Sequence, residues 1–279
     1  MHSNKQFSYH RFSLSSALQK YVKYAWIMQS KGLSTRPDLL IADGYPEIIF
    51  VQRGAYQKAF IDAEKKAVIV DQSCVVGIQT QSALVKRLGP CQLIGIKLNP
   101  AGAYVLLGKK LPQIVDQNLA LHQFGLDWLS ELDQGLLDCH SEEAVSSLIS
   151  ATFLTQTAHL APGEQDAFAA SILQFILASK GQISVGKLAE RYHLSLRQLQ
   201  RKFKKVFGIS PKKFINLIRF KHLYKSSILK QKSPDSYLDH GYYDQMHFIK
   251  DFKKQMGINP SQSTASFFLR MNEIARQSS

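Results

Sequence analysis

The chain has 279 residues, of which 45% are hydrophobic and 20% charged, and its formal net charge at pH 7 is +14. This length predicts two domains, and the ordinary composition excludes a disordered or fibrous chain. The sequence has no uninterrupted run of 18 apolar residues and no apolar stretch typical of a secretory signal, so we expect a cytoplasmic protein without a membrane partner.

The first 99 residues contain short apolar runs separated by turn residues. These runs are rich in β-branched side chains, which favours strands over helices. They are residues 25–28, 47–51, 67–70, 74–78 and 93–98. The pattern predicts a β-rich sheet or barrel.

After Pro100 the apolar residues recur at helical spacing, in residues 101–108, 126–138 and 141–160. Ser141 predicts the start of the last helix, because its side chain can accept a free backbone N–H. These helices fit two arrangements equally well. They form a helical layer packed on the β-rich part, or a helix pair that mediates dimerisation.

The residues Ala161-Pro162-Gly163 break the helical pattern, and the charge balance changes at the same point. Residues 1–162 hold 15 Lys and Arg against 13 Asp and Glu, whereas residues 163–279 hold 20 against 8. We therefore predict an N-terminal domain over 1–162 and an all-helical domain over 163–279. The basic excess favours a nucleic-acid partner, although a basic surface that only confers solubility gives the same charge.

The basic part contains a repeat with an offset of 49 residues. The segment FKKVFGISP at 203–211 recurs as FKKQMGINP at 252–260. In each copy, Gly suits the left-handed position that ends a helix, and Pro three residues later prevents its continuation. Ser195 and Asp244, also 49 residues apart, are good N-cap residues, and Ser195 with Gln198 predicts a capping box.

A short helix over residues 185–192 precedes the first repeated helix. Leu188, Ala189 and Tyr192 share one face, and the small Ala189 allows a close helix crossing. This predicts a helix-turn-helix unit over about 184–208, whose second helix is presented to the major groove. The repeat predicts a second unit over about 234–257.

A joining helix is predicted between the two units. Ser210 is its N-cap, Pro211 its first residue, and it runs to about residue 230. Twenty residues of helix span about 30 Å. That is close to the roughly 34 Å of one DNA turn, so both second helices could enter successive major grooves.

The span from about 169 to 264 resembles the DNA-binding domain of the AraC/XylS family, on the segments LAERYHLSLRQLQRKFKKVFGISP and GYYDQMHFIKDFKKQMGINPSQ. DGYPEIIF and IGIKLNPAGAYVLLG resemble more weakly the sensor domain of some members. The resemblance implies an α+β chain with a β-rich, cupin-like N-terminal domain and a helical layer. An all-α domain of two helix-turn-helix units and a linker helix follows.

Two positions depart from that family's pattern. His193 occupies the turn of the first unit, where a small residue is common. The segment from Ser233 to His240 is about one helical turn shorter than usual, and Pro234 restricts where its helix can begin. We therefore expect a truncated or irregular support helix in the second unit.

The outward positions of the two repeated helices are the predicted DNA contacts. Arg can bind guanine and Gln can bind adenine through paired hydrogen bonds. The predicted base contacts are Leu196, Arg197, Gln200 and Arg201 in the first unit, and Gln245, Met246, His247 and Lys250 in the second. The predicted phosphate contacts are Lys204, Lys205, Lys253 and Lys254.

Each of these contacts has a plainer alternative. The polar residues could form a solvated helix face, and Met246 and His247 could pack instead. The aromatic residues of the repeat are predicted to be buried core rather than a stacking platform for single strands. They are Phe203, Phe207, Phe248 and Phe252.

The sequence predicts no cofactor, no metal and no enzymatic activity. Its scattered histidines lack metal-ligand spacing, and no nucleophile elbow or phosphate-binding glycine loop occurs. Cys74, Cys91 and Cys139 lack the spacing of a zinc or redox site and are predicted to be reduced core thiols. Asp43 and Glu47 could contact a ligand, but a loop or strand-edge role is favoured.

These features predict a sequence-specific DNA-binding transcription regulator. Its expected partner is double-stranded DNA, and its N-terminal domain is expected to act through a small-molecule effector or a homodimer. RNA polymerase is a further expected partner if the protein is an activator. The alternative class is a non-specific nucleic-acid-binding protein whose basic half only coats phosphates.

Overall fold

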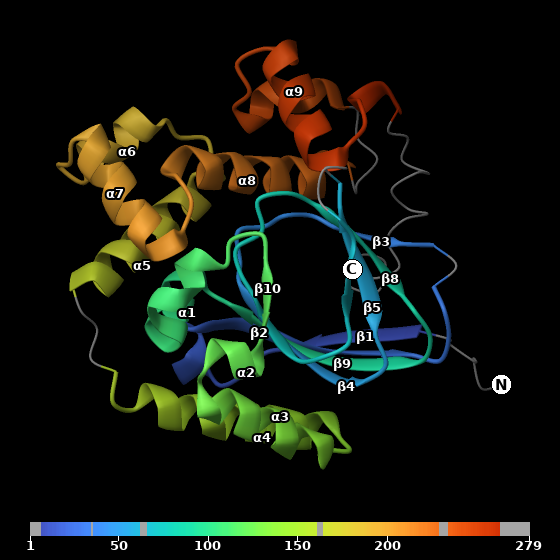
Figure 1. The fold of residues 1–279 in the computed structure, drawn as a ribbon. Helices are drawn as coiled ribbons and strands as arrows, with labels where there is room; N and C mark the ends of the chain where they lie inside the picture. The colour runs from blue at the N-terminus through green and yellow to red at the C-terminus, as the bar shows by residue number, and fades with distance from the viewer. Residues whose placement is uncertain (1–6, 35, 62–65, 161–163, 229–233, 263–279) are drawn as a thin grey trace.

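The computed structural model describes residues 7–34, 36–61, 66–160, 164–228 and 234–262. Figure 1 shows two curved β-sheets at the centre, helices α3 and α4 along one side, and the C-terminal helices along the opposite side. The α+β fold class, with a β-rich N-terminal part and an all-helical C-terminal part, is confirmed. The predicted domain boundary at Ala161-Pro162-Gly163 lies outside the described residues.

The ten strands of the described residues form two antiparallel sheets. The six-stranded sheet has the order β1 (Phe7–Phe12), β2 (Val22–Ser30), β9 (Cys91–Leu98), β4 (Glu47–Arg53), β7 (Cys74–Val76) and β10 (Asn118–Ala120). The four-stranded sheet has the order β3 (Asp38–Leu40), β8 (Ala83–Arg87), β5 (Tyr56–Phe60) and β6 (Val68–Val70). Each of the five apolar runs overlaps a strand.

Strand β4 shows why these runs lack the usual apolar–polar alternation. Ile49 and Val51 point toward the second sheet and share a buried cluster with Tyr56. Ile48 and Phe50 point the other way into a second cluster. Because successive side chains of a strand face opposite sides, a strand covered on both faces is apolar throughout.

The helices after Pro100 lie against the outer face of the six-stranded sheet. They are α1 (Pro100–Leu107), η2 (Gly108–Gln113), α2 (Leu121–Phe124), α3 (Asp127–Leu137) and α4 (Glu142–Thr157). Leu129 of α3 and Phe153 of α4 are fully buried in the cluster that holds Phe50. Ser141 accepts the N–H of Ala144 and begins α4, as predicted. The helical-layer arrangement is thus confirmed, and dimerisation stays a prediction.

From residue 164 onward, the described residues form helices and turns. The helices are α5 (Glu164–Ala178), α6 (Val185–Arg191), α7 (Leu196–Phe207), α8 (Pro211–Leu223) and α9 (Gln245–Met256). A π-helix η3 (Tyr224–Ile228) continues α8, and 3-10 helices η4 (Pro234–His240) and η5 (Pro260–Gln262) flank α9. In Figure 1, α8 lies over the sheets with α6 and α7 at one end and α9 at the other.

Three further findings concern the cysteines, possible metal sites and possible membrane-spanning helices. Cys74, Cys91 and Cys139 are free cysteines; the first two are buried and Cys139 is partly exposed. In the described ranges, no set of three or more His, Cys, Asp or Glu side chains is placed to hold a metal ion. The same ranges contain no helix that is long and apolar enough to span a membrane.

Candidate nucleic-acid interface

The first helix-turn-helix unit consists of α6 and α7, and a serine side chain caps the N-terminus of each helix. Ser184 accepts the N–H of Lys187 and begins α6. Ser195 and Gln198 form the predicted capping box, with bonds of 3.2 and 2.9 Å. Gly208 ends α7 in the left-handed conformation, with φ of 72°. The ends of α7 are therefore set by its own sequence.

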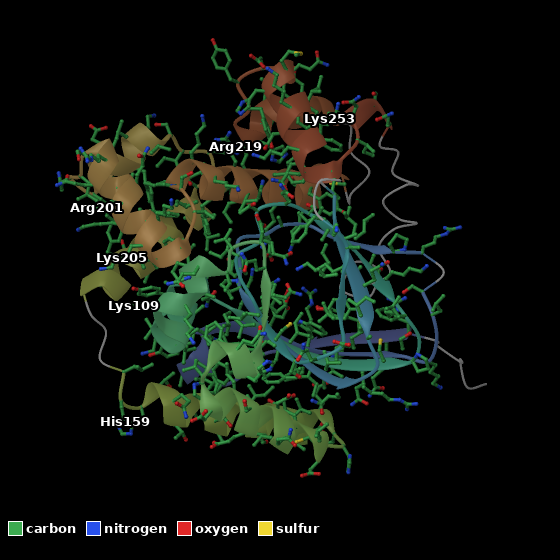
Figure 2. The ribbon with its side chains drawn as sticks, viewed as in Figure 1. Lys109, His159, Arg201, Lys205, Arg219 and Lys253 are labelled. Carbon is green, nitrogen blue, oxygen red and sulfur yellow. The ribbon has the colours of Figure 1, made fainter. Side chains whose placement is uncertain are left out.

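Helix α7 separates its side chains into a buried face and an exposed face. Its buried residues are Leu199, Phe203, Val206 and Phe207. Each of the six predicted contacts on this helix is exposed, namely Leu196, Arg197, Gln200, Arg201, Lys204 and Lys205. The predicted core role of Phe203 and Phe207 is confirmed. Figure 2 shows Arg201 and Lys205 at the edge of the molecule, away from the sheets.

Helix α9 repeats this arrangement 49 residues later. Asp244 accepts the N–H of His247 at 2.7 Å, and Gly257 ends the helix with φ of 70°. Phe248, Asp251, Phe252, Gln255 and Met256 are buried. The exposed residues include the predicted contacts Gln245, Met246, Lys250, Lys253 and Lys254. The predicted contacts thus share an exposed face here too.

His247 is the one predicted contact of α9 that is half-buried. Its ring meets the Tyr242 ring edge to face, with 5.2 Å between centroids. Met246, for which packing was the alternative, is 59% exposed. Of these two residues, it is therefore His247 that packs, against Tyr242 in the first turn of α9.

Sequence reasoning missed Tyr243, whose side chain is 89% exposed immediately before the N-cap of α9. The repeat aligns Tyr243 with Leu194, which packs against the buried cluster of the first unit. In the second unit Tyr242 is buried instead, with its hydroxyl donating to Asp251. This shift of one residue leaves Tyr243 beside the predicted base contacts, and the repeat alignment alone would have placed it in the core.

The second unit has the irregular support helix that the sequence predicts. The segment is a 3-10 helix from Pro234 to His240 rather than an α-helix. Tyr237 in this helix stacks on Phe248 of α9, with ring centroids 5.4 Å apart. The support element is short, yet it packs on the buried face of α9.

The joining helix begins at Pro211 with Ser210 as its N-cap, as predicted. Its α-helical part ends at Leu223 after 13 residues, about 20 Å, and the π-helix η3 continues it to Ile228. The Ser226 hydroxyl donates to the carbonyl of His222 at 2.8 Å, a bond that competes with the helical pattern and bends helices. The predicted end at residue 230 lies outside the described residues.

Both units pack against the N-terminal part. In the first unit, a Cβ on Gly208 would lie 2.3 Å from the carbonyl oxygen of Pro112 in η2, so that turn and η2 are in close contact. In the second unit, the Gln255 side-chain amide donates to the Thr80 carbonyl at 3.4 Å. The pose of each unit is therefore coupled to the N-terminal part.

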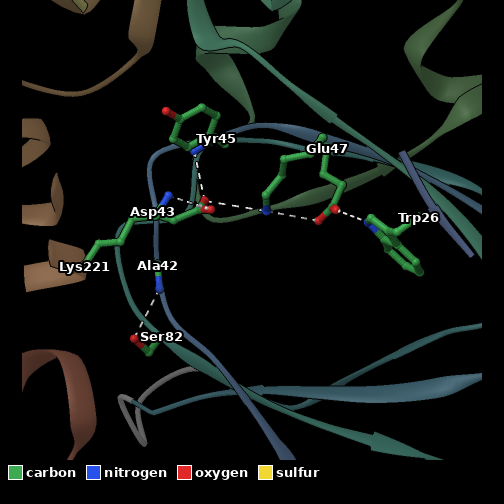
Figure 3. A network of polar contacts seen from close by, with 8 residues as sticks. Trp26, Ala42, Asp43, Tyr45, Glu47, Ser82 and Lys221 are labelled. Carbon is green, nitrogen blue, oxygen red and sulfur yellow. Dashed lines mark hydrogen bonds and ion pairs between the residues drawn. The ribbon is translucent and has the colours of Figure 1, made fainter. Parts of the chain in front are cut away.

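A buried ionic network joins α8 to the sheets (Figure 3). Asp43 lies 3.1 Å from the Lys221 ammonium of α8 and 3.5 Å from that of Lys97. Lys97 also pairs with Glu47 at 3.4 Å, and Glu47 accepts the Trp26 indole N–H at 2.6 Å. The sequence left Asp43 and Glu47 either as ligand contacts or as loop and strand-edge residues. In the structure, both carboxylates are paired with side chains of the protein itself.

The charges of this network stabilise one another. Burial acts to raise the pKa of Asp43, but the ammonium groups of Lys97, Lys221 and Lys23 outweigh it and hold that pKa well below its ordinary value. Burial acts to lower the pKa of Lys97, and Asp43 and Glu47 outweigh it in turn, so the pKa of Lys97 is raised. Asp43 is therefore ionised in the folded protein at neutral pH.

Two helix-turn-helix units, joined by a helix and each presenting a capped helix with a basic outer face, define a double helix-turn-helix DNA-binding domain. The comparisons agree. Residues 188–265 match the family described as "Helix-turn-helix domain", and residues 10–120 match "Domain of unknown function (DUF6597)". The C-terminal part of the chain is thus an AraC-type helix-turn-helix domain.

One curated relative is the HTH-type transcriptional regulator MtrA of Neisseria gonorrhoeae. It is 33% identical over 105 residues, which are 36% of this chain and 34% of that protein. The likeness therefore spans about a third of either chain.

Among solved structures, ToxT of Vibrio cholerae matches with a TM-score of 0.45 and 13% identity, over 96% of this chain and 98% of that one. ToxT from strain O395, bound to (E)-4-(8-methylnaphthalen-1-yl)but-3-enoic acid, matches with a TM-score of 0.44 and 13% identity, over 96% and 99%.

The His193→Gly substitution tests the turn of the first unit. His193 has φ of 50°, and relief of this left-handed strain is worth about 1 to 2 kcal/mol, of which the greater freedom of glycine in the unfolded chain removes about 0.4 to 1. We expect the free energy of unfolding, measured with urea, to rise by about 0.5 to 1 kcal/mol. His193→Ala keeps a Cβ and is the matched control; an equal gain in both variants would show that the backbone conformation is not the cause.

The Asp43→Asn substitution tests the ionic network. Because the folded pKa of Asp43 is lowered, its contribution is present above the unfolded value of about 3.9 and is lost as pH falls through the folded value. We expect the variant to lose about 1 to 3 kcal/mol of unfolding free energy at pH 7, and the difference from the native chain to shrink as pH falls below about 4. Urea unfolding from pH 7 to pH 2 measures both.

The control is Glu131→Gln, which removes an exposed carboxylate from α3. It should change the unfolding free energy by less than about 0.5 kcal/mol. A loss for Asp43→Asn that stays constant down to pH 2 would contradict the ionic explanation.

Proposed function

We propose that the protein is a sequence-specific DNA-binding transcription regulator. The observation that carries this proposal is the pair of 12-residue helices α7 and α9, each capped at both ends and each with a buried aromatic face and an exposed basic face. A helix with this division of side chains can enter a major groove without exposing its core. The relative described as a transcriptional regulator supports the same conclusion.

In the first unit, Arg197, Gln200 and Arg201 read base edges, and Leu196 contacts a thymine methyl group. These residues occupy the first half of α7, which is the part of a recognition helix that reaches bases. Lys204 and Lys205 lie in the last turn, where they neutralise phosphates.

In the second unit, Gln245, Met246 and Lys250 contact bases. His247, half-buried in the first turn of α9, adds a base contact through the exposed part of its ring. Lys253 and Lys254 contact phosphates, as their counterparts do in the first unit. Tyr243 is added to this surface because its side chain is 89% exposed beside the N-cap.

The N-terminal part controls this domain. Each unit packs against it, and Lys221 of the joining helix pairs with Asp43 of the N-terminal part. A small-molecule effector or a homodimer contact would shift DNA affinity only if it favoured one arrangement of the two parts over another. RNA polymerase is a partner if the protein activates transcription.

The competing function is non-specific coating of phosphates. A selected DNA site and random DNA, competed for the full chain, separate the two functions. Specific binding exceeds non-specific binding by about 10³ or more. Equal affinity for both DNAs would exclude sequence-specific recognition.

Arg201→Ala tests the reading of bases. We expect it to weaken binding to the selected site by about 1 to 3 kcal/mol and to relax base preference at one position, because an arginine that binds guanine makes two hydrogen bonds. Binding to a library that varies each base pair measures both effects.

Lys205→Ala is the matched control, since it removes one charge from the same helix. It should weaken binding to every sequence alike and reduce the slope of log affinity against log salt by about 1. Uniform weakening by Arg201→Ala as well would make Arg201 a phosphate contact.

A further inference from the structure

The loop that precedes the first helix-turn-helix unit contacts the second unit directly. This loop, residues 179–184, joins α5 to α6. The side-chain amide of Gln182 donates to the backbone carbonyl of Asp239 at 2.8 Å, in the 3-10 helix that supports α9. The two units are therefore joined by a contact that does not pass through the helix between them.

Arg219 of α8 makes a second connection. Its Nε donates to the carbonyl of Gly181 at 3.0 Å, and its guanidinium carbon lies 5.6 Å from the centre of the Tyr242 ring. Tyr242 is itself held in place, because its hydroxyl donates to the buried Asp251 carboxylate at 2.8 Å. One side chain thus touches the loop of the first unit and the turn of the second, and Figure 2 shows it between them.

Two glycines allow this close approach. Gly181 has φ of 72°, and a Cβ there would lie 2.6 Å from the backbone nitrogen of Arg219. Gly241 has φ of 76°, and a Cβ there would lie 3.0 Å from Cγ of Gln182. Both positions combine a left-handed backbone with a close contact, which only glycine tolerates without strain. The two glycines therefore allow the loop to pack directly on the turn of the second unit.

Helix α8 packs on both units, through Phe214 against α7 and Phe220 against α9, and Gln182 and Arg219 add contacts beside it. Its α-helical geometry ends at Leu223, and a π-helix follows from Tyr224 to Ile228. Such wide turns are rare and are frequently found at functional sites. The support helix that Gln182 contacts also meets this change of geometry, since the Ser226 hydroxyl of η3 is hydrogen-bonded to the His240 ring at 3.2 Å.

We propose that Arg219 and Gln182 are positioning residues that fix the relative pose of α7 and α9, and that the protein thereby discriminates the spacing of the two halves of its DNA site. This inference rests on the proposed function. One added base pair moves the second half-site by about 3.4 Å and rotates it by about 34 to 36° around the duplex. A pose that these two side-chain contacts help to hold cannot follow that movement without losing them.

The test measures binding of the full chain by fluorescence anisotropy to its selected site and to versions with one or two base pairs inserted or removed between the halves. For the native chain, we expect a change of one base pair to weaken binding about 30-fold or more, comparable to a base mismatch. For Arg219→Ala with Gln182→Ala, we expect weaker binding at the preferred spacing and less than about 5-fold discrimination between spacings.

Three variants separate positioning from charge and folding. Arg219→Lys keeps the charge but loses the Nε–H and the planar group, so it should lose spacing discrimination as Arg219→Ala does. Lys212→Ala removes an exposed charge at the start of α8 and should keep it. If Arg219→Ala lowers the thermal unfolding midpoint below the assay temperature, Gln182→Ala alone carries the test, because Gln182 is exposed.

The outcomes distinguish this inference from the function beneath it. A native chain that selects no site would overturn the proposed function. A native chain with sharp spacing discrimination, retained unchanged in the double variant, would overturn only the positioning role of Arg219 and Gln182. An equal loss of affinity at every spacing would assign both residues to fold or charge instead.

Discussion

The structure of the C-terminal part depends on burial of the aromatic faces of α7 and α9 against one helix, α8. Phe214 of α8 contacts Phe203 and Phe207 of α7, each with ring centroids 5.6 Å apart, and Phe220 of α8 contacts Phe252 of α9 at 5.8 Å. Such aromatic pairs contribute about 0.5 to 1.5 kcal/mol each beyond the area that they bury. Because these faces are held inward, the opposite, basic faces of α7 and α9 are left exposed.

The same helix is the point of contact with the N-terminal part. Phe214 also lies against Gly44, which immediately follows the Asp43 that pairs with Lys221. Any shift of α8 relative to the sheets would therefore disturb an apolar contact and a buried ion pair together. A change in the N-terminal part that moved the loop with Asp43 and Gly44 would therefore move α8. Because α8 packs on both helix-turn-helix units, it would act on both at once.

Sequence patterns predicted the local features of this protein well. The caps at Ser195, Asp244 and Ser210 and the helix ends at Gly208 and Gly257 are set by residues within a turn of each other, so they follow from the sequence. The strands β5 and β8 were not predicted, because their buried residues include Lys58 and Arg87 rather than apolar side chains alone. The change from α-helix to π-helix at Tyr224 was not predicted, because the bond from the Ser226 hydroxyl to the His222 carbonyl is not visible in apolar periodicity.

The sequence by itself determined the two repeated helices, their ends and their exposed basic faces, and hence the class of DNA-binding domain. Only the tertiary structure decided which distant residues hold those helices in place. The partners of the Asp43–Lys221 pair are 178 positions apart, and those of the Gln182–Asp239 bond are 57 apart. Periodicity and capping act over a few residues, whereas these pairings arise only when the chain closes on itself.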